Sequence, residues 1–288
     1  MDARWIFALV RPSIGSDRKK RGRVLAAPVP PVDARAHNRA AWDLLSRSGD
    51  RWTVPVDART VERARRGEWS VQLTNTKPVP RGWFPPDMRD VEILALASGG
   101  GQQACIFAAA GARVTLLDNS PEQLAKDRLV ATRHGLELRL EEGTMEDISR
   151  FPDASFDLVF NPISVIFTRD ARAVWREAAR VLRSGGALLA GFVQPVAYLF
   201  DRAALDGAAP LAVKHKVPYA DERDLPREEL EARLGRREPL EFGHTLTDLL
   251  GAQLDAGLHL VAMYEDVFGD ATLDEHIATQ MATRAVKR

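Results

Sequence analysis

A glycine-rich turn and one aspartate carry the clearest chemical signal in this sequence. The apolar run 91–97 leads into a turn with glycine at 99, 100 and 101, and the later apolar run 113–117 ends at Asp118. An apolar run bounded by glycines predicts a buried parallel strand. The Ala-rich stretch between the two runs predicts a helix packed on the sheet. A strand–helix–strand unit with this turn and this acid is the layout that binds a ribose-bearing cofactor.

Each of these residue types has a chemical use. A side chain at Gly99 or Gly101 would hold a ligand away from the backbone, and a tight turn needs unrestricted φ. The helix that follows offers unpaired N–H groups to an anion. Asp118 at a strand tip can accept hydrogen bonds from both ribose hydroxyls. A strand–helix turn beside a solvated aspartate is the simpler interpretation, and the joint occurrence of turn and acid argues against it.

The glycine turn alone does not identify the cofactor. Residues 99–104 fit the Gly-x-Gly-x-x-Ala pattern of dinucleotide sites, so an NAD(P)-dependent oxidoreductase of Rossmann type is one hypothesis. No Tyr-x-x-x-Lys pair for hydride transfer is visible, which counts against it. The choice therefore depends on the rest of the chain.

Composition narrows the possible partners. The 288 residues carry a formal net charge of zero, so the molecule offers no overall attraction to nucleic acid or to a membrane surface. The single cysteine, Cys105, excludes an internal disulfide, and the scattered histidines lack metal-ligand spacing. No apolar run approaches the roughly 20 residues of a membrane span, so we expect a cytoplasmic protein without a metal. The sequence gives no signal for an oligomeric state.

Three regions follow from the pattern along the chain. We expect a flexible N-terminal extension over 1–32, a helical cap over 33–86 and an α/β core over 87–288. Within the core, the Pro-rich and charged segment 194–243 interrupts the alternation and predicts a lid above the carboxyl edge of the sheet. Four tryptophans fall in the cap. Most are expected to pack it onto the core, with one or two lining a pocket: Trp42, Trp52, Trp69 and Trp83.

Strands and helices alternate through the core. Repeated strand–helix units predict a mostly parallel, Rossmann-like seven-stranded sheet with helices on both faces. The expected strands cover 91–97, 113–118, 136–141, 156–160, 187–193, 258–265 and 281–287, the last antiparallel to the sixth. The expected helices cover 104–110, 121–134, 170–182 and 245–256, with Ser120 as the N-cap of the second.

From about residue 91 onward the chain resembles a class I S-adenosylmethionine-dependent methyltransferase. The glycine turn and Asp118 resemble the first two cofactor elements of that family, and 142–147 resembles the loop that holds the adenine. The segments 151–159 and 180–188 resemble the approaches to the fourth and fifth strands. Five elements in family order indicate the bacterial small-molecule type with an N-terminal cap. The resemblance implies transfer of a methyl group from S-adenosylmethionine to a small-molecule acceptor.

The glycine turn departs from the family pattern at two places. Ala95 stands where the family commonly carries an acid, and Ala97 stands where it has the first glycine. Loss of the acid removes one support for the methionine end of the cofactor. A non-catalytic, cofactor-binding member of the family is therefore a further alternative.

The resemblance also implies site residues. It places the ribose on Asp118, the adenine beside Met145 and Glu146, and the meeting point of cofactor and acceptor at Asn161. The full expected cofactor set is Ala97, Ser98, Gly99, Gly101, Gln103, Asp118, Asn119, Ser120, Gln123, Thr144, Met145, Glu146 and Asn161.

A hydroxyl acceptor would need a general base. The candidates are His37 in the cap, His215 in the lid and His244 at the start of a helix, with Tyr198 as an orienting hydroxyl. For each histidine a surface or capping role is the competing interpretation. The identity of the acceptor is not readable from the sequence.

Overall fold

A seven-stranded sheet forms the centre of the computed structural model, which describes residues 32–288. Its strand order is β3-β2-β1-β4-β5-β9-β8, and only β9 runs antiparallel to its neighbours. The strands are β1 (Glu92–Leu96), β2 (Arg113–Asp118), β3 (Leu138–Glu142), β4 (Phe156–Asn161), β5 (Leu182–Val193), β8 (Leu258–Asp266) and β9 (Gln280–Lys287). The predicted sheet and its antiparallel last strand are confirmed. The expected flexible extension lies outside the described residues, apart from Val32.

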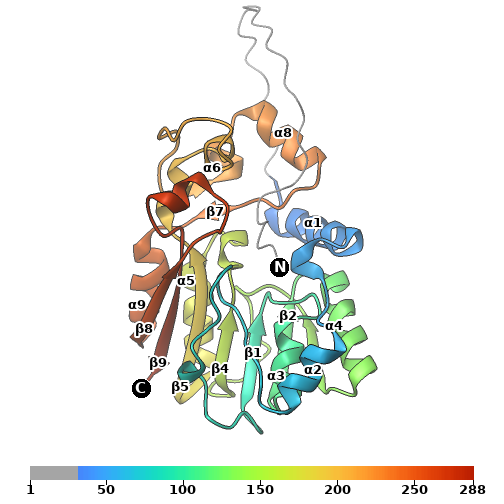
Figure 1. The fold of residues 1–288 in the computed structure, drawn as a ribbon. Helices are drawn as coiled ribbons and strands as arrows, with labels where there is room; N and C mark the ends of the chain where they lie inside the picture. Colours follow the sequence, from blue (N-terminus) through green and yellow to red (C-terminus); the bar gives the residue numbers. More distant parts are fainter. Residues whose placement is uncertain (1–31) are drawn as a thin grey trace, which may run out of the picture.

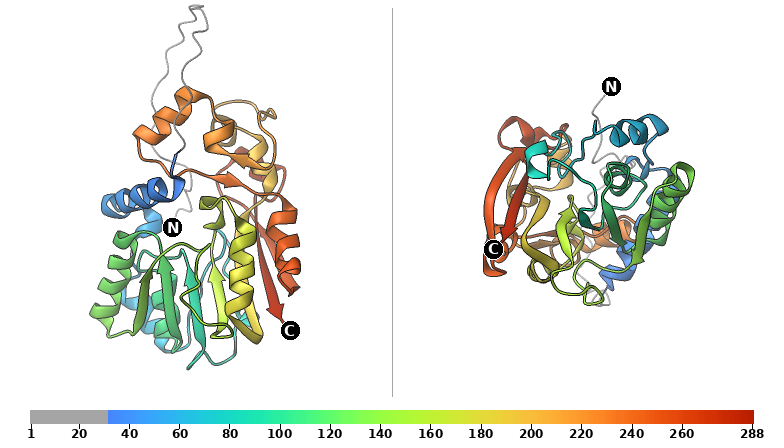
Figure 2. Two further views of the ribbon diagram at one scale, coloured as in Figure 1. Left: turned by 180° about the vertical axis from the view of Figure 1, so that it is seen from behind. Right: turned by 90° about the horizontal axis from the view of Figure 1, so that it is seen from below.

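Both faces of the sheet are buried because alternate residues of each strand point to opposite sides. On one face, Ile93 and Ala95 of β1 belong to the apolar cluster that includes Phe107 of α3 (Gln103–Ala109). On the other face, Leu94 and Leu96 belong to the cluster around Trp175 of α5 (Ala171–Val181). Figure 2 shows α5, in yellow, covering the rear face of the sheet.

Helix α4 (Pro121–His134) has the bounds that the sequence predicts. The Ser120 side chain caps it by accepting a hydrogen bond from the Gln123 amide, and Pro121 occupies the first turn. This cap fixes where the helix begins relative to the tip of β2, which is three residues before Pro121. The start of α4 and the end of β2 are therefore one local unit.

Two elements differ from the expectation. Strand β5 begins at Leu182 and not at 187, directly after α5, and its pairing with β4 contains a register shift after Phe156. The expected helix over 245–256 is a π-helical stretch, Thr247–Gly251, followed by α9 (Ala252–Asp255). The carbonyl of Asp248 accepts a hydrogen bond of 3.0 Å from the Trp175 indole, which gives it a partner outside its own helix.

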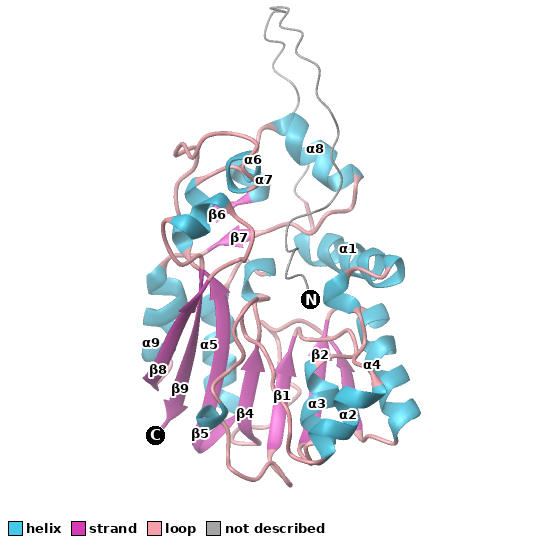
Figure 3. Ribbon diagram, in the orientation of Figure 1, coloured by secondary structure: helices cyan, strands magenta, loops and turns pink. Residues whose placement is uncertain are grey.

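The carboxyl ends of the parallel strands point toward α1 and toward segment 194–243, the expected lid (Figures 1 and 3). Helix α1 (Ala34–Ser48) lies above the strand tips beside α4, whereas α2 (Ala58–Arg65) packs on α3 at the side of the sheet. Only part of the expected cap therefore covers the sheet edge. Segment 194–243, the expected lid, contains α6 (Arg202–Leu205), β6 (Tyr219–Ala220), α7 (Asp221–Asp224), α8 (Arg227–Gly235) and β7 (Phe242–Gly243).

Candidate active site

The glycine turn packs directly against the tip of β2. A side chain at Gly99 would place its Cβ 2.8 Å from the Cβ of Gln123 and 2.9 Å from Oδ2 of Asp118. Gly100 has a φ of +109°, and Ala97, where the family pattern has glycine, has a φ of +46°. The turn thus needs glycine at 99 for space and at 100 for backbone conformation.

Asp118 binds the turn through its carboxylate. Its Oδ2 accepts a hydrogen bond from the Gly99 amide at 3.0 Å, and its Oδ1 accepts one from the Ser120 amide at 2.9 Å. The residue is 8% exposed, and burial raises the pKa of the carboxyl to about 6. Each oxygen still has a lone pair available to a hydroxyl donor.

The tips of β3 and β4 continue the same edge of the sheet. Met145 is buried in the loop after β3, and the neighbouring Glu146 carboxylate accepts a hydrogen bond from the Thr168 hydroxyl. Asn161, the last residue of β4, is fully buried and donates to the carbonyl of Leu96 at 3.2 Å and to the hydroxyl of Ser164 at 2.9 Å. The tips of β1 and β4 are therefore joined by a side-chain hydrogen bond.

A cavity of about 1020 Å³ opens along these strand tips. Ten of the residues expected to bind a cofactor line it: Ala97, Ser98, Gly99, Gln103, Asp118, Asn119, Gln123, Thr144, Met145 and Glu146. Two of their polar atoms, the Ser98 hydroxyl and Oε1 of Gln123, are buried without a hydrogen-bond partner among residues 32–288. Such atoms are expected to find a partner in a bound ligand.

The remaining three expected residues lie outside the lining. A Cβ at Gly101 would lie 3.0 Å from side-chain atoms of Pro55 and of Val130 in α4, so the missing side chain serves close packing of the turn. Ser120 donates from its hydroxyl to Asp43 of α1 at 2.6 Å while it caps α4. Asn161 lies behind Met145 and holds the strand tips. These three residues shape the site from outside the cavity.

None of the acid–base candidates lines the cavity. One imidazole nitrogen of His37 lies 2.8 Å from the carbonyl oxygen of Glu238, and one of His244 lies 3.1 Å from that of Val165. Burial lowers the pKa of His244. The Tyr198 hydroxyl donates to Glu241 within the lid, and burial raises its pKa well above the usual value. His215 packs against Tyr219, also in the lid. Each side chain has a local structural contact.

The other half of the cavity is lined by residues that the sequence did not single out individually, most of them in the expected cap and lid. Its walls include Asn38 of α1, Leu73 of the segment before β1, Phe167 of the β4–α5 connection and Phe242 of β7. Asn38 is held by hydrogen bonds to and from the backbone of Leu240. The sequence carried no signal for this contact, because the burial of Asn38 depends on how α1 packs on the distant Leu240.

The tryptophans of the cap divide into two groups. Trp42 and Trp52 line the cavity, and Trp42 meets Phe167 edge to face with ring centroids 5.2 Å apart. Trp69 packs on Phe84, and Trp83 packs on Tyr264. The expectation that one or two of the four line a pocket is confirmed.

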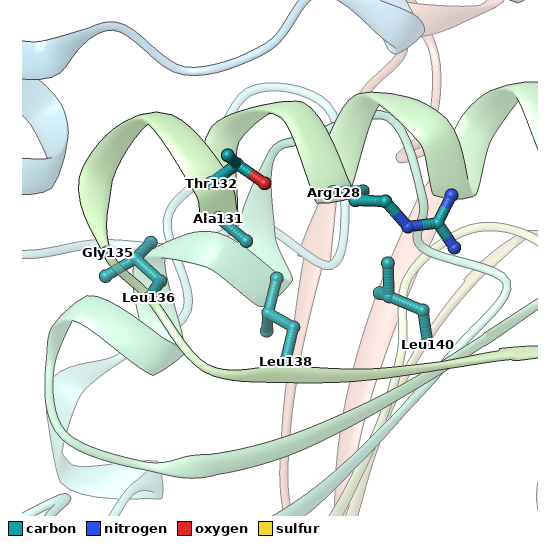
Figure 4. Close-up of a pocket in the computed structure, with 7 residues that line it drawn as sticks. All are labelled: Arg128, Ala131, Thr132, Gly135, Leu136, Leu138 and Leu140. Carbon is teal, nitrogen blue, oxygen red and sulfur yellow. The ribbon is translucent and has the colours of Figure 1, made fainter.

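A smaller hollow of about 410 Å³ lies between α4 and β3 (Figure 4). It is lined by Arg128, Ala131, Thr132, Gly135, Leu136, Leu138 and Leu140. Arg128 brings the only charge, and neither the glycine turn nor Asp118 takes part. This composition offers binding surface but no reacting group.

The part of the chain that the structure describes shows neither a metal-binding cluster nor a membrane-spanning helix. No three His, Cys, Asp or Glu side chains within it are grouped so as to hold a metal ion. None of its helices combines the length and apolar character needed to cross a membrane.

Known proteins that resemble this chain include methyltransferases. A family described as a methyltransferase domain matches residues 94–190. The uncharacterized methyltransferase YbaJ of Bacillus subtilis is 46% identical over 252 residues, which cover 88% of this chain and 98% of the relative. The chain belongs to the methyltransferase family, and its type is class I, S-adenosylmethionine-dependent.

Solved structures support the fold. An S-adenosylmethionine-dependent methyltransferase from Mesorhizobium loti aligns with a TM-score of 0.53 at 18% identity, over 72% of this chain and 95% of its own. The 1,6-didemethyltoxoflavin-N1-methyltransferase of Burkholderia thailandensis, solved with 1,6-didemethyltoxoflavin and S-adenosylhomocysteine, aligns with a TM-score of 0.54 at 16% identity, over 93% of each chain. The cofactor of this protein is S-adenosylmethionine, and the family assignment selects methyl transfer over the nicotinamide-dependent alternative.

Proposed function

We propose that this protein transfers a methyl group from S-adenosylmethionine to a small, largely apolar acceptor bound under α1 and the lid. One observation carries the proposal: the cavity that begins at Gly99 and Asp118 continues without interruption to the aromatic side chains of Trp42, Phe167 and Phe242. Single-ligand pockets typically have about 300–1,000 Å³. The volume of about 1020 Å³ lies at the upper end of this range, so the support for a second ligand comes from the extent of the cavity and not from its volume.

The residues at the glycine turn fit the cofactor. Asp118 offers carboxylate oxygens toward a ribose, and Gly99 lets a ligand approach the backbone beside it. The unpartnered Ser98 hydroxyl and Gln123 amide oxygen offer further polar contacts on the same wall. Met145 offers an apolar surface to the adenine. When bound, S-adenosylmethionine supplies a methyl group on a sulfonium, whose leaving group is already good.

Positioning is then the main task of the chain. Holding two reactants in line contributes up to about 7–11 kcal/mol in favourable cases. Helix α1, through Asn38 and Trp42, and the lid, through Phe242, line the acceptor side of the cavity, and a bound acceptor would displace water there. We infer that segments 33–86 and 194–243 act as the cap and lid that select the acceptor.

The acceptor needs a reacting atom with an available lone pair at neutral pH. No histidine, cysteine, lysine or tyrosine among residues 32–288 lines the cavity. Its carboxylates are engaged elsewhere: Asp33 caps α1, Asp118 holds the glycine turn and Glu146 accepts from Thr168. A neutral amine or a thiolate meets this requirement, whereas an alcohol would need a base that the lining lacks.

Titration calorimetry with S-adenosylmethionine and S-adenosylhomocysteine tests the cofactor half of the proposal. Both are expected to bind, and absence of binding by either at millimolar concentration would overturn it. The acceptor half is tested by incubating the protein with panels of amines, thiols and alcohols and measuring release of S-adenosylhomocysteine. Turnover with an amine or thiol is expected and would reject the non-catalytic alternative. Turnover with alcohols alone would contradict the absence of a base.

A further inference from the structure

A second buried carboxylate holds the glycine turn. Asp127, on helix α4, accepts a hydrogen bond from the Gly100 amide through Oδ2 at 2.8 Å. Its Oδ1 accepts a longer hydrogen bond, 3.5 Å, from the Cys105 thiol on α3. Asp127 does not line the cavity, so its contact with the site passes through the turn.

The turn is thereby held by two carboxylates. Gly99 donates to Asp118 of β2, and Gly100 donates to Asp127 of α4. The Gly100 amide nitrogen also lies 3.3 Å from the carbonyl oxygen of Gln123, a longer and weaker hydrogen bond than the one to Asp127. Because its φ is +109°, a conformation that glycine leaves easily, Gly100 depends on these acceptors for its orientation.

The buried charge of this carboxylate is unfavourable for the fold, although its hydrogen bonds satisfy amides of the turn. Asp127 is fully buried, and the groups that act on its charge are backbone amides, the Cys105 thiol and the Asp118 carboxylate, with no arginine or lysine among them. A buried carboxylate without a cationic partner costs folding free energy. Ala95, at the end of β1, is fully buried in an apolar cluster and offers the turn no polar group.

We propose that Asp127 is a positioning residue for the cofactor. It fixes the Gly100 amide and, through it, the conformation in which Gly99 meets Asp118 at the cavity wall. This inference rests on the proposed function, since the turn must receive a ligand for its position to matter. Asp127 acts from behind the turn and touches no ligand itself.

The test is the affinity for S-adenosylhomocysteine of three variants measured by calorimetry against the wild type. Asp127→Ala removes the acceptor and is expected to weaken binding about tenfold, the cost of a poorly paired amide. Asp127→Asn keeps an acceptor oxygen in place and is expected to stay within about threefold of the wild type. Asp157→Ala is the matched control, because Asp157 also accepts a backbone amide, that of Glu92, at the opposite edge of the sheet.

Each outcome has a defined meaning. Weak binding by Asp127→Ala, with near-normal binding by Asp127→Asn and by Asp157→Ala, supports the positioning role. Equal affinity of Asp127→Ala and the wild type overturns it, as does an equal loss in the Asp157→Ala control. Should Asp127→Ala fail to fold, Asp127→Glu, which displaces the oxygens by one methylene, takes its place with the same expected loss. Failure of the wild type to bind would instead overturn the proposed function.

Discussion

The amide of Gly99 donates a hydrogen bond of 3.0 Å to Oδ2 of Asp118, and this contact joins the tips of β1 and β2. The same carboxylate holds the amide of Ser120, where α4 begins. The glycine turn, the acid and the helix start are therefore one hydrogen-bonded unit. A change in any of them is expected to alter the wall of the cavity that Gly99 and Asp118 share.

Gly99→Ala is expected to weaken binding of S-adenosylhomocysteine by at least about tenfold. The added Cβ would lie 2.8 Å from Cβ of Gln123 and 2.9 Å from Oδ2 of Asp118, so the turn or the acid must move. Calorimetry measures the loss. Gly82→Ala is the control, because its Cβ would meet no atom within 4 Å. Equal affinities of the two variants would show that the turn does not contact the ligand.

Ala97→Gly is expected to stabilise the protein. Ala97 has a φ of +46°, a left-handed conformation that costs an L-residue about 1–2 kcal/mol and costs glycine almost nothing. The gain is offset in part by the greater freedom of glycine in the unfolded chain, which leaves an expected net gain of about 0.5–1 kcal/mol. Thermal and denaturant unfolding measure it. Ala108→Gly, within helix α3, should instead lower the free energy of unfolding by about 1 kcal/mol. Destabilisation by Ala97→Gly would contradict the strain argument.

Helix α1 is expected to be coupled to the cofactor turn through Asp43 and Ser120. The Ser120 hydroxyl donates to Oδ1 of Asp43 at 2.6 Å, and the Glu122 amide donates to the same oxygen at 3.3 Å. A double-mutant cycle of Asp43→Ala and Ser120→Ala should give a coupling of about 0.5–1.5 kcal/mol in unfolding free energy. Strictly additive effects would mean that the contact contributes nothing in solution.

Stability should fall as pH rises toward neutrality because of Asp127. Burial raises the pKa of this carboxyl from 3.8 to about 7, so between these values the folded state keeps a proton that the unfolded chain releases. The free energy of unfolding then decreases with pH by at most about 1.4 kcal/mol per pH unit for one proton. Asp127→Asn removes this pH-dependent contribution to the free energy of unfolding.

The measurement compares melting temperatures of Asp127→Asn and the ligand-free wild type from about pH 5 to about pH 8. The melting temperature of Asp127→Asn should increase relative to that of the wild type as pH rises. The difference between the two melting temperatures should become constant above about pH 8. A difference that stays constant over this range would show that Asp127 keeps its ordinary pKa. The nearby Asp118, whose pKa burial raises to about 6, is present in both proteins, and because its charge also raises the pKa of Asp127 it cancels only in part from the comparison.

The parts of the site on regular elements could be predicted from the sequence. Apolar runs with glycine and acid at their ends place Gly99 and Asp118 at neighbouring strand tips, because parallel strands end on the same edge of a sheet. The meeting of these two residues is confirmed. The bounds of α4 also followed from local chemistry, through the Ser120 cap and Pro121.

Long-range contacts could not be predicted in this way. Gly101 fits the expected ligand pattern, yet it packs against Pro55, whose position depends on how the cap folds onto the core. Asp127 looks like an ordinary polar residue of an amphipathic helix, and only the fold shows that it lies under the turn. The same holds for Phe242, which reaches the cavity from the far end of the lid.

The central claim is that Asp118 and the glycine turn together bind the cofactor. Its most direct test is the dissociation constant of S-adenosylhomocysteine, measured by calorimetry for the wild type and for Asp118→Ala. The account predicts binding by the wild type and a loss of about a hundredfold or more in the variant, since the ribose loses a charged acceptor and the Gly99 amide loses its partner. An unchanged dissociation constant in Asp118→Ala, with the fold intact, would contradict it.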